Sequence, residues 1–286
     1  MAAHRARGPQ GPEAQITVIN RDGSEAVFDD NRIIHTMERV GVPRELYDRV
    51  LAHIKEKVQA DNTISTDEIF YHIREFLIDK DKKSALRLNL RQAIFELGPT
   101  GFPFEKYLGE IFESQRYKVE VDLIMEGECV SHEVDLLIEK DGKREIVEAK
   151  FHNQNGGRTD VQVLLYTYAR FLDVREKNRI DNVWVATNTK LTSDAITYAE
   201  CKGMKALSWN YPAEENLHEF VERPKMYPVT TLTDLTIEEE RRLIDNGIVL
   251  ASDLLKVSDE EFASKYLIDE KRIPIIRESA ELICNP

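Results

Sequence analysis

The chain has 286 residues, which is long for one hydrophobic core and predicts two or three domains. Apolar residues make up 42% and charged residues 32%, as in ordinary globular proteins, and no apolar run of about 18 residues occurs, so no membrane partner is expected. The net charge of −13 argues against tight DNA binding through a broad basic surface. A divalent metal, a local basic stripe or an oligomer would have to offset this charge.

The N-terminus and the cysteines both bear on the location of the protein in the cell. Residues 1–14 mix Arg, Gly, Pro and Ala without the apolar stretch of a secretory signal, and we expect a flexible tail there. The cysteines at 129, 201 and 284 match no zinc or redox spacing. Reduced thiols in a cytoplasmic protein are therefore expected.

Residues 15–99 predict a β-hairpin followed by a helical bundle. The β-branched run at 16–19, the turn residues 20–23 and the return run at 25–28 form the hairpin, because Asp-Gly favours a tight turn. Apolar residues spaced by three or four predict helices around 33–40 and 46–58. Ser65 and Glu68 mark the start of a third helix, and a fourth is expected over 84–97.

Residues 100–222 predict an α/β domain, because strands alternate with helices. The expected order is a helix over 104–115, strands over 117–124, 132–139 and 144–150, a helix over 160–173, a strand over 183–187, a helix over 193–202 and a strand over 206–209. Residues 223–286 follow a joint at Pro224 and predict a small all-helical domain. The fold class is thus multidomain α/β with a mixed sheet at its centre.

The central pattern is Asp135, a turn, and then Glu148-Ala149-Lys150. Residues two apart on a strand face the same way, so Glu148 and Lys150 share a face that Asp135 can reach from the preceding strand. Two converging carboxylates bind Mg²⁺ or Mn²⁺, which polarises a phosphodiester, and a nearby ammonium can stabilise the developing charge. We therefore take Asp135 and Glu148 as metal ligands.

The alternative is that these residues are ordinary solvent-exposed charges at strand edges, because an Asp followed by a Glu-x-Lys pattern also occurs by chance. Three features favour the site: the apolar run after Asp135, the polar stretch after Lys150, and a further acid, Glu105, on the helix before the strands.

These residues resemble restriction-endonuclease-like proteins of the Mrr and archaeal-resolvase kind, with a PD-(D/E)xK motif, over about residues 101–209. The resemblance implies that Glu105, Asp135, Glu148 and Lys150 form an active site. Gln162 and Tyr166 match positions that line it in that family. His132 either joins the site or makes a local hydrogen bond.

Residues 16–97 resemble an ATP-cone, the domain that reads ATP or dATP, through Val18 to Ser24 and Phe28 to Ile33. The resemblance implies a nucleotide site in which basic side chains clamp the triphosphate. Its candidate residues are Val18, Asn20, Arg21, Asp22, Gly23, Arg32, Thr66 and Arg91.

Asn20 and Arg32 stand where the cone pattern commonly has Lys, and losing one cation costs about 1–3 kcal/mol of triphosphate binding. A cone that no longer binds nucleotide and only mediates dimerisation is the alternative. No P-loop is present, so nucleotide hydrolysis is not expected.

The C-terminal residues 243–248 and 252–255 resemble a helix-hairpin-helix-like module, whose Gly-containing turn contacts phosphate. The many acidic residues there favour a protein-interaction or structural role equally.

Together the patterns predict a Mg²⁺-dependent DNA endonuclease whose activity or assembly responds to ATP or dATP, and which forms a homo-oligomer. The alternatives are a non-catalytic, nucleotide-sensing DNA-binding regulator and a structural oligomer built through the cone.

Overall fold

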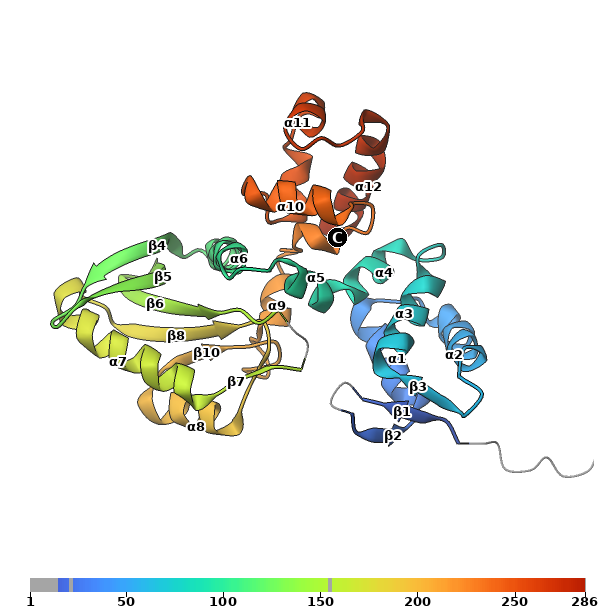
Figure 1. Cartoon of the computed structure of the whole chain (residues 1–286), viewed down its shortest axis with the longest axis horizontal. Coiled ribbons are helices and arrows are strands. Elements are labelled where there is room, and N and C mark those ends of the chain that lie inside the picture. Colours follow the sequence, from blue (N-terminus) through green and yellow to red (C-terminus); the bar gives the residue numbers. More distant parts are fainter. Residues whose placement is uncertain (1–14, 21–22, 154–155, 286) are drawn as a thin grey trace, which may run out of the picture. The chain divides into compact units, whose positions relative to one another are not determined.

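The structure is a computed structural model that describes residues 15–20, 23–153 and 156–285, so the tail expected at 1–14 lies outside the described residues. The described residues form two compact units, one that ends at Leu88 and one that begins at Asn89. Each unit is coloured by sequence in Figure 1. No helix of the described residues is long and apolar enough to span a membrane.

The boundary between the units differs from the expected one at residue 99. The helix expected over 84–97 consists of two helices, α4 (Lys82–Leu88) and α5 (Leu90–Glu96), and the units divide between them. Helix α5 packs against η2 (Val229–Thr231), where the Thr230 hydroxyl donates a hydrogen bond to the Ala93 carbonyl at 2.6 Å. This packing joins α5 to the second unit.

The N-terminal unit contains the predicted hairpin of β1 (Thr17–Ile19) and β2 (Glu25–Val27). A strand that the sequence analysis missed, β3 (Thr63–Ser65), pairs with β1 in parallel. Its helices are α1 (Asp30–Val40), η1 (Arg44–Leu46), α2 (Tyr47–Glu56), α3 (Thr66–Leu77) and α4. A buried apolar core joins the helices, and it includes Met37, Ile54 and Ile73.

Helix α3 begins where the sequence predicts. The Ser65 hydroxyl accepts a hydrogen bond from the Glu68 backbone N–H at 3.1 Å, and the Glu68 carboxylate accepts one from the Ser65 N–H at 2.8 Å. This reciprocal capping satisfies two donors at the helix start. Because Ser65 also ends β3, the cap fixes the angle between that strand and α3.

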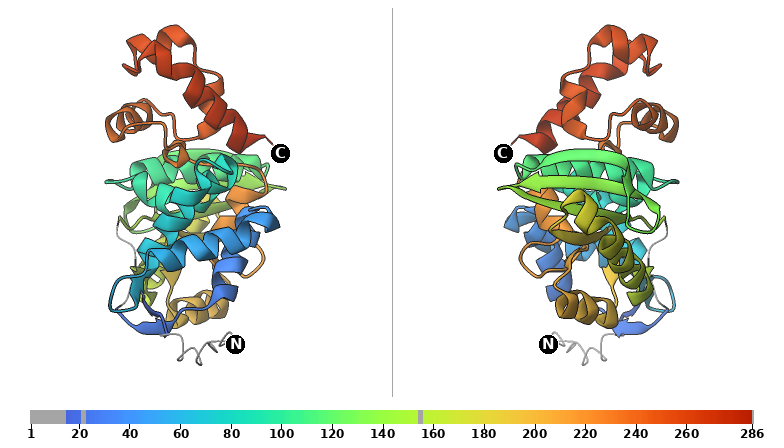
Figure 2. Two further views of the ribbon diagram at one scale, coloured as in Figure 1. Left: turned by 90° about the vertical axis from the view of Figure 1, so that its right-hand side faces the viewer. Right: turned by 90° about the vertical axis from the view of Figure 1, so that its left-hand side faces the viewer.

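A mixed five-stranded sheet, in the order β10-β8-β6-β5-β4 among the described residues, forms the centre of the second unit and confirms the predicted mixed α/β domain. Strands β4, β5 and β6 are antiparallel, and β6, β8 and β10 are parallel. The β4–β5 hairpin faces the reader in the right-hand view of Figure 2. The strands are β4 (Lys118–Glu126), β5 (Ser131–Lys140), β6 (Lys143–Lys150), β8 (Asn182–Thr187) and β10 (Lys205–Leu207).

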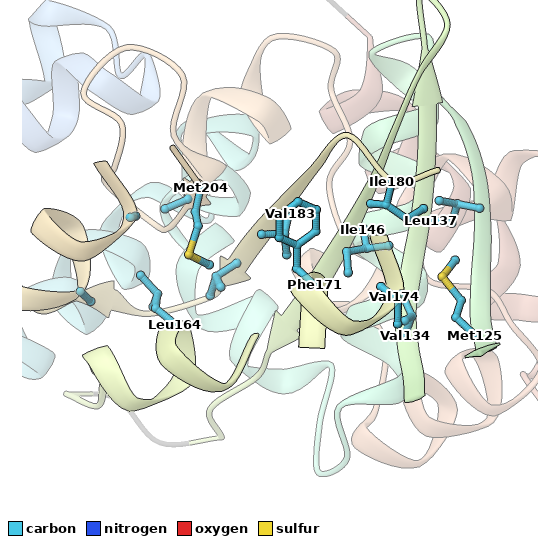
Figure 3. Close-up of a cluster of buried hydrophobic side chains, with 14 of the residues drawn as sticks. Met125, Val134, Leu137, Ile146, Leu164, Phe171, Val174, Ile180, Val183 and Met204 are labelled. Carbon is cyan, nitrogen blue, oxygen red and sulfur yellow. The ribbon is translucent and has the colours of Figure 1, made fainter. Parts of the chain in front are cut away.

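Helices cover both faces of this sheet (Figure 1). On one face lies α6 (Phe102–Ser114), where the Phe112 ring is 5.4 Å from that of Trp184. On the other lie α7 (Val161–Asn178) and α8 (Ser193–Lys202), and Figure 3 shows their core with Phe171 near Ile146. Coverage of both faces explains why β5 and β6 carry runs of buried apolar residues rather than strict alternation.

Two short strands of the central α/β domain, β7 (Arg158–Thr159) and β9 (Lys190–Leu191), pair with each other in parallel. The C-terminal region is helical, as predicted. The remaining helices are α9 (Leu217–Glu222), η2, α10 (Ile237–Asp245), η3 (Ala251–Leu255), α11 (Asp259–Ser264), η4 (Glu270–Arg272) and α12 (Ile273–Cys284).

The turn around Gly247 differs from the phosphate-binding hairpin that the sequence analysis considered. Gly247 has φ 86° and follows the end of α10. Its N–H donates to the Ile244 carbonyl at 2.8 Å, and the Ile248 N–H donates to the Leu243 carbonyl at 2.9 Å. These donors terminate α10 and are therefore already used within the chain.

Candidate active site

Neighbouring strands position the predicted carboxylates. Strands β5 and β6 pair antiparallel up to Leu136 and Val147, so Asp135 and Glu148 are the next residues on the two strands. Residues opposite each other on paired strands point to the same face. The Asp135 carboxylate accepts a hydrogen bond from the Ala149 N–H at 2.6 Å, which holds it one residue from Glu148.

Strand β8 supports the other side of this strand end. Glu148 pairs with Val185 and Lys150 with Thr187 in a parallel ladder, and both Val185 and Thr187 are fully buried. Because Lys150 lies two residues beyond Glu148, its exposed side chain leaves the sheet on the same face. The structure thus brings Asp135, Glu148 and Lys150 to one end of one pair of strands.

Arginine 170 is the main site residue that sequence reasoning missed. Its guanidinium forms an ion pair with the Glu148 carboxylate, and both side chains are mostly buried, with exposed fractions of 12% and 17%. The guanidinium also lies 4.9 Å from the Tyr166 ring centroid. Within the described residues the Arg170 Nε has no hydrogen-bond partner.

The signal for Arg170 was present in the spacing of α7. Gln162, Tyr166 and Arg170 are four residues apart and therefore follow one face of the helix. Gln162 itself is exposed in the first turn, where its N–H donates to the Asp160 side chain at 3.0 Å. Gln162 therefore lies on the same face of α7 as Arg170. Among the described residues, its side chain forms no hydrogen bond with Asp135 or Glu148.

Glu105 approaches the cluster from α6. Burial, followed by the negative charges of Asp135, Asp122, Glu133 and Glu148, raises the pKa of Glu105 to about 7. Asp122, which belongs to this group, has φ 55° in the middle of β4, where the ladder with β5 is interrupted. The helix acid and the strand acids therefore share one electrostatic environment.

Burial also raises the pKa values of both strand acids. For Asp135, burial outweighs the Ala149 N–H and the charge of Arg170, both of which lower the pKa. For Glu148, burial and then repulsion from Asp135 raise the pKa, against the opposing effects of Arg170 and Lys150. Carboxylates that are largely buried and repel one another favour an added cation.

A polar network holds the loop that follows Lys150. The His152 N–H donates to Asn188 Oδ1 at 2.9 Å, and Asn188 Nδ2 donates to the His152 carbonyl at 2.7 Å. The His152 ring lies 3.0 Å from the Thr159 hydroxyl, and burial followed by the charge of Lys150 lowers its pKa. This network fixes the strand end beside the acids, and the sequence analysis did not identify it.

His132 makes a hydrogen-bonded contact with an acid of α7 that does not belong to the candidate site. Its Nε2 lies 2.8 Å from the Asp173 carboxylate, which also accepts a hydrogen bond from the Cys129 N–H at 2.8 Å. The hydrogen bond to His132, followed by that to Cys129, keeps the pKa of Asp173 far below its ordinary value. This contact ties the β4–β5 turn to α7, and it supports the alternative in which His132 makes a hydrogen bond instead of joining the site.

A separate pocket in the N-terminal unit brings together part of the predicted nucleotide site. Val18, Asn20, Arg32 and Thr66 all line it, with Phe28, Asp29 and apolar residues of α1 and α3. The Thr66 hydroxyl donates to the Ile19 carbonyl at 3.4 Å. Gly23 has φ 81° in the predicted turn, whereas Arg21 and Asp22 lie outside the described residues.

Arg91 is not among the residues that line this pocket. It belongs to α5 of the second unit, where its guanidinium carbon lies 5.9 Å from the Phe95 ring centroid and 5.8 Å from that of Trp209. The reason is the break between α4 and α5, which assigns Arg91 to the other unit.

Comparison with known proteins gives two matched regions. Residues 99–210 match the family described as restriction endonuclease, and residues 227–284 match the family described as AF1548-like, C-terminal. Neither region includes residues 1–98, so the nucleotide interpretation rests on the sequence and the pocket.

Individual relatives match nearly two thirds of the chain. An uncharacterized protein of Archaeoglobus fulgidus is 34% identical over 177 residues, which are 62% of this chain and 99% of that protein. The crystal structure of a protein of unknown function, AF1548, has a TM-score of 0.57 at 29% identity and covers 65% of this chain and 100% of that one. The structure of protein VC1899 from Vibrio cholerae, at 15% identity over 60% of this chain and 40% of that one, has a TM-score of 0.25 and does not inform the fold.

Proposed function

We propose that this chain, which belongs to the AF1548-like family and carries an Mrr-type restriction endonuclease domain, is a Mg²⁺-dependent DNA endonuclease. The observation that carries the proposal is the meeting of Asp135, Glu148 and Lys150 at the end of β5 and β6. The family match supports nuclease activity and DNA as its substrate class. The particular residues and their roles are our inference.

The donor set fits a hard divalent cation. Asp135 and Glu148 offer carboxylate oxygens, which Mg²⁺ and Mn²⁺ prefer, and their raised pKa values reflect burial without enough positive charge. Asp135 and Glu148 would hold the ion, and Glu105, whose pKa their charges raise, is the candidate for a third acid. Such an ion polarises the phosphodiester and activates water.

The remaining side chains supply charge and proton transfer. Lys150 offers an exposed ammonium that can stabilise negative charge on the phosphate. Glu105, with a pKa of about 7, can accept or release a proton near neutral pH. Arg170 holds the Glu148 carboxylate through their ion pair, and Gln162 extends the same face of α7 toward substrate.

Plasmid cleavage tests this assignment. Wild type should nick plasmid DNA with Mg²⁺ and lose the activity with a chelator, whereas Asp135→Ala and Lys150→Ala should each cut at least about 100-fold more slowly. Lys143→Ala is the matched control, because Lys143 lies at the opposite end of the same strand and is also exposed.

Two outcomes count against the nuclease. Unchanged cleavage in both Asp135→Ala and Lys150→Ala would remove the assignment. DNA binding by wild type without any cleavage would instead favour the non-catalytic regulator.

Adenine nucleotide regulation is the second part of the proposal. Support comes from the pocket of the N-terminal unit, whose lining residues include Arg32, Val18, Asn20 and Thr66, together with Asp29. A guanidinium beside an apolar pocket suits a triphosphate attached to a base. We propose that ATP or dATP binds there and controls activity or assembly into a homo-oligomer.

Nucleotide titration tests this part. Arg32→Ala should weaken ATP or dATP binding by about 1–3 kcal/mol, since a charge-assisted contact is lost. Arg39→Ala on the same helix is the control, because Arg39 is exposed and lies outside the pocket. Identical size-exclusion profiles with ATP, with dATP and without nucleotide would contradict nucleotide-driven assembly.

A further inference from the structure

Two histidines and a glutamate converge in the N-terminal unit, outside both sites described above. His53 comes from α2, and His72 and Glu75 come from α3, where they are three residues apart and share a helix face. His53 Nε2 lies 3.1 Å and His72 Nδ1 3.0 Å from the same Glu75 oxygen, Oε2. One ligand atom from each residue lies within 4.8 Å of the others.

These distances resemble those between ligands of a tetrahedral zinc ion. Zinc binds imidazole nitrogen and carboxylate oxygen at about 2.0–2.2 Å, which places neighbouring ligand atoms about 3.3 Å apart. The two nitrogen–oxygen distances differ from this value by only a few tenths of an ångström. Small side-chain rotations would therefore admit the ion.

Neighbouring side chains restrict the rings. The His53 ring packs against Phe76 at 5.5 Å, and the His72 ring makes an edge contact with Tyr71 at 5.2 Å. The capped start of α3 fixes the helix that carries His72 and Glu75. Ligands held before binding lose less conformational freedom when the metal arrives.

The cluster is accessible to solvent, and it contains a carboxylate with a lowered pKa. The side-chain exposed fractions are 21% for His53, 16% for His72 and 40% for Glu75, so an ion can reach all three residues from solvent. Hydrogen bonds from His72 and then His53 lower the pKa of Glu75, and the charge of Lys57 also contributes. Glu75 is thus available as an anionic ligand.

We propose that His53, His72 and Glu75 form a zinc site that joins α2 to α3. Imidazole ligands suit Zn²⁺ better than Mg²⁺, which separates this site from the acid cluster of the second unit. Three protein ligands leave a fourth position for water. Because the site links two helices of one unit, zinc stabilises that unit against unfolding.

Zinc titration of the full chain tests the site. The background carries Asp135→Asn and Glu148→Gln, so the nuclease acids do not contribute, and metal is removed with a chelator first. One Zn²⁺ should bind per chain in a competition assay with a chromogenic chelator. The melting temperature of the N-terminal unit should rise as zinc is added.

The variants are Glu75→Gln, which keeps the side-chain shape, and His72→Ala. Each should weaken zinc binding at least about 10-fold. Replacing a residue that only supports a metal ligand already weakens metal binding by about 10-fold or more, and these two residues are proposed as ligands themselves. His35→Ala is the matched control, because His35 is an exposed histidine that pairs with Glu38 at the same three-residue spacing without a second histidine. The proposal would be overturned if the Glu75→Gln variant bound zinc as well as the background chain does. It would also be overturned if the background chain bound no zinc at all.

Discussion

Replacing Glu105 by Gln should stabilise the metal-free protein while reducing its activity. Glu105 is half-buried on α6, and burial together with the charges of Asp135, Asp122, Glu133 and Glu148 raises its pKa from 4.5 to about 7. Gln has nearly the same shape and no charge. The substitution therefore removes the repulsion at all pH values and removes the third acid from the site.

The size of the effect follows from the pKa. At about 1.36 kcal/mol for each pH unit, the difference between 4.5 and about 7 corresponds to about 3.4 kcal/mol. Because solvent screens a half-exposed group, we expect about 1–2 kcal/mol. Since the pKa is raised in the folded state, the carboxyl costs no stability below about pH 4.5, and the protein loses stability as the pH rises through about 7.

Chemical unfolding measures this difference directly. The two tryptophans of the chain, Trp184 and Trp209, both lie in the second unit, so their fluorescence reports its unfolding. With chelator present, Glu105→Gln should be more stable than wild type at pH 8 and nearly equal to it at pH 5. Glu113→Gln is the control, because Glu113 is exposed on the same helix. A gain of equal size at both pH values, or no gain at pH 8, would refute the argument from repulsion.

Three further substitutions test individual elements. Arg170→Ala should lower the stability of the second unit by about 1–3 kcal/mol, because the mostly buried Glu148 loses its partner; no loss in Trp-monitored unfolding would contradict this. Ser65→Ala should destabilise the N-terminal unit by about 1 kcal/mol, because the cap of α3 is lost. Urea unfolding followed by circular dichroism measures this loss, and an unchanged unfolding midpoint would show that the cap is unimportant. Gly247→Ala should cost about 1 kcal/mol, because φ is 86° there; equal thermal stability of the two proteins would argue against a strained turn.

Most of the fold followed from local patterns in the sequence. Ser65 and Glu68 identified the start of α3, and the apolar runs identified the strands of the main sheet. Strand β3 was missed because it has only three residues and gains its hydrogen bonds from β1, which is distant in sequence. The break between α4 and α5 was missed because apolar spacing continues through both helices, and the packing of α5 against η2 is a tertiary contact that spacing does not reveal.

The candidate site could be predicted only in part. The motif gave Asp135, Glu148 and Lys150, whose positions depend on a short hairpin with a fixed register. Arg170 lies on another element, and its contact with Glu148 depends on how α7 packs on the sheet. Arg91 was expected in the nucleotide site for the same reason, because the sequence pattern does not show which unit α5 joins.

A crystal structure of the chain with Mn²⁺, located by anomalous scattering, tests the central claim most directly. The account predicts a manganese ion in contact with the carboxylates of both Asp135 and Glu148 at the end of β5 and β6. Side chains of Asp135 and Glu148 that point to opposite faces of the sheet, with no manganese between them at saturating concentration, would contradict it.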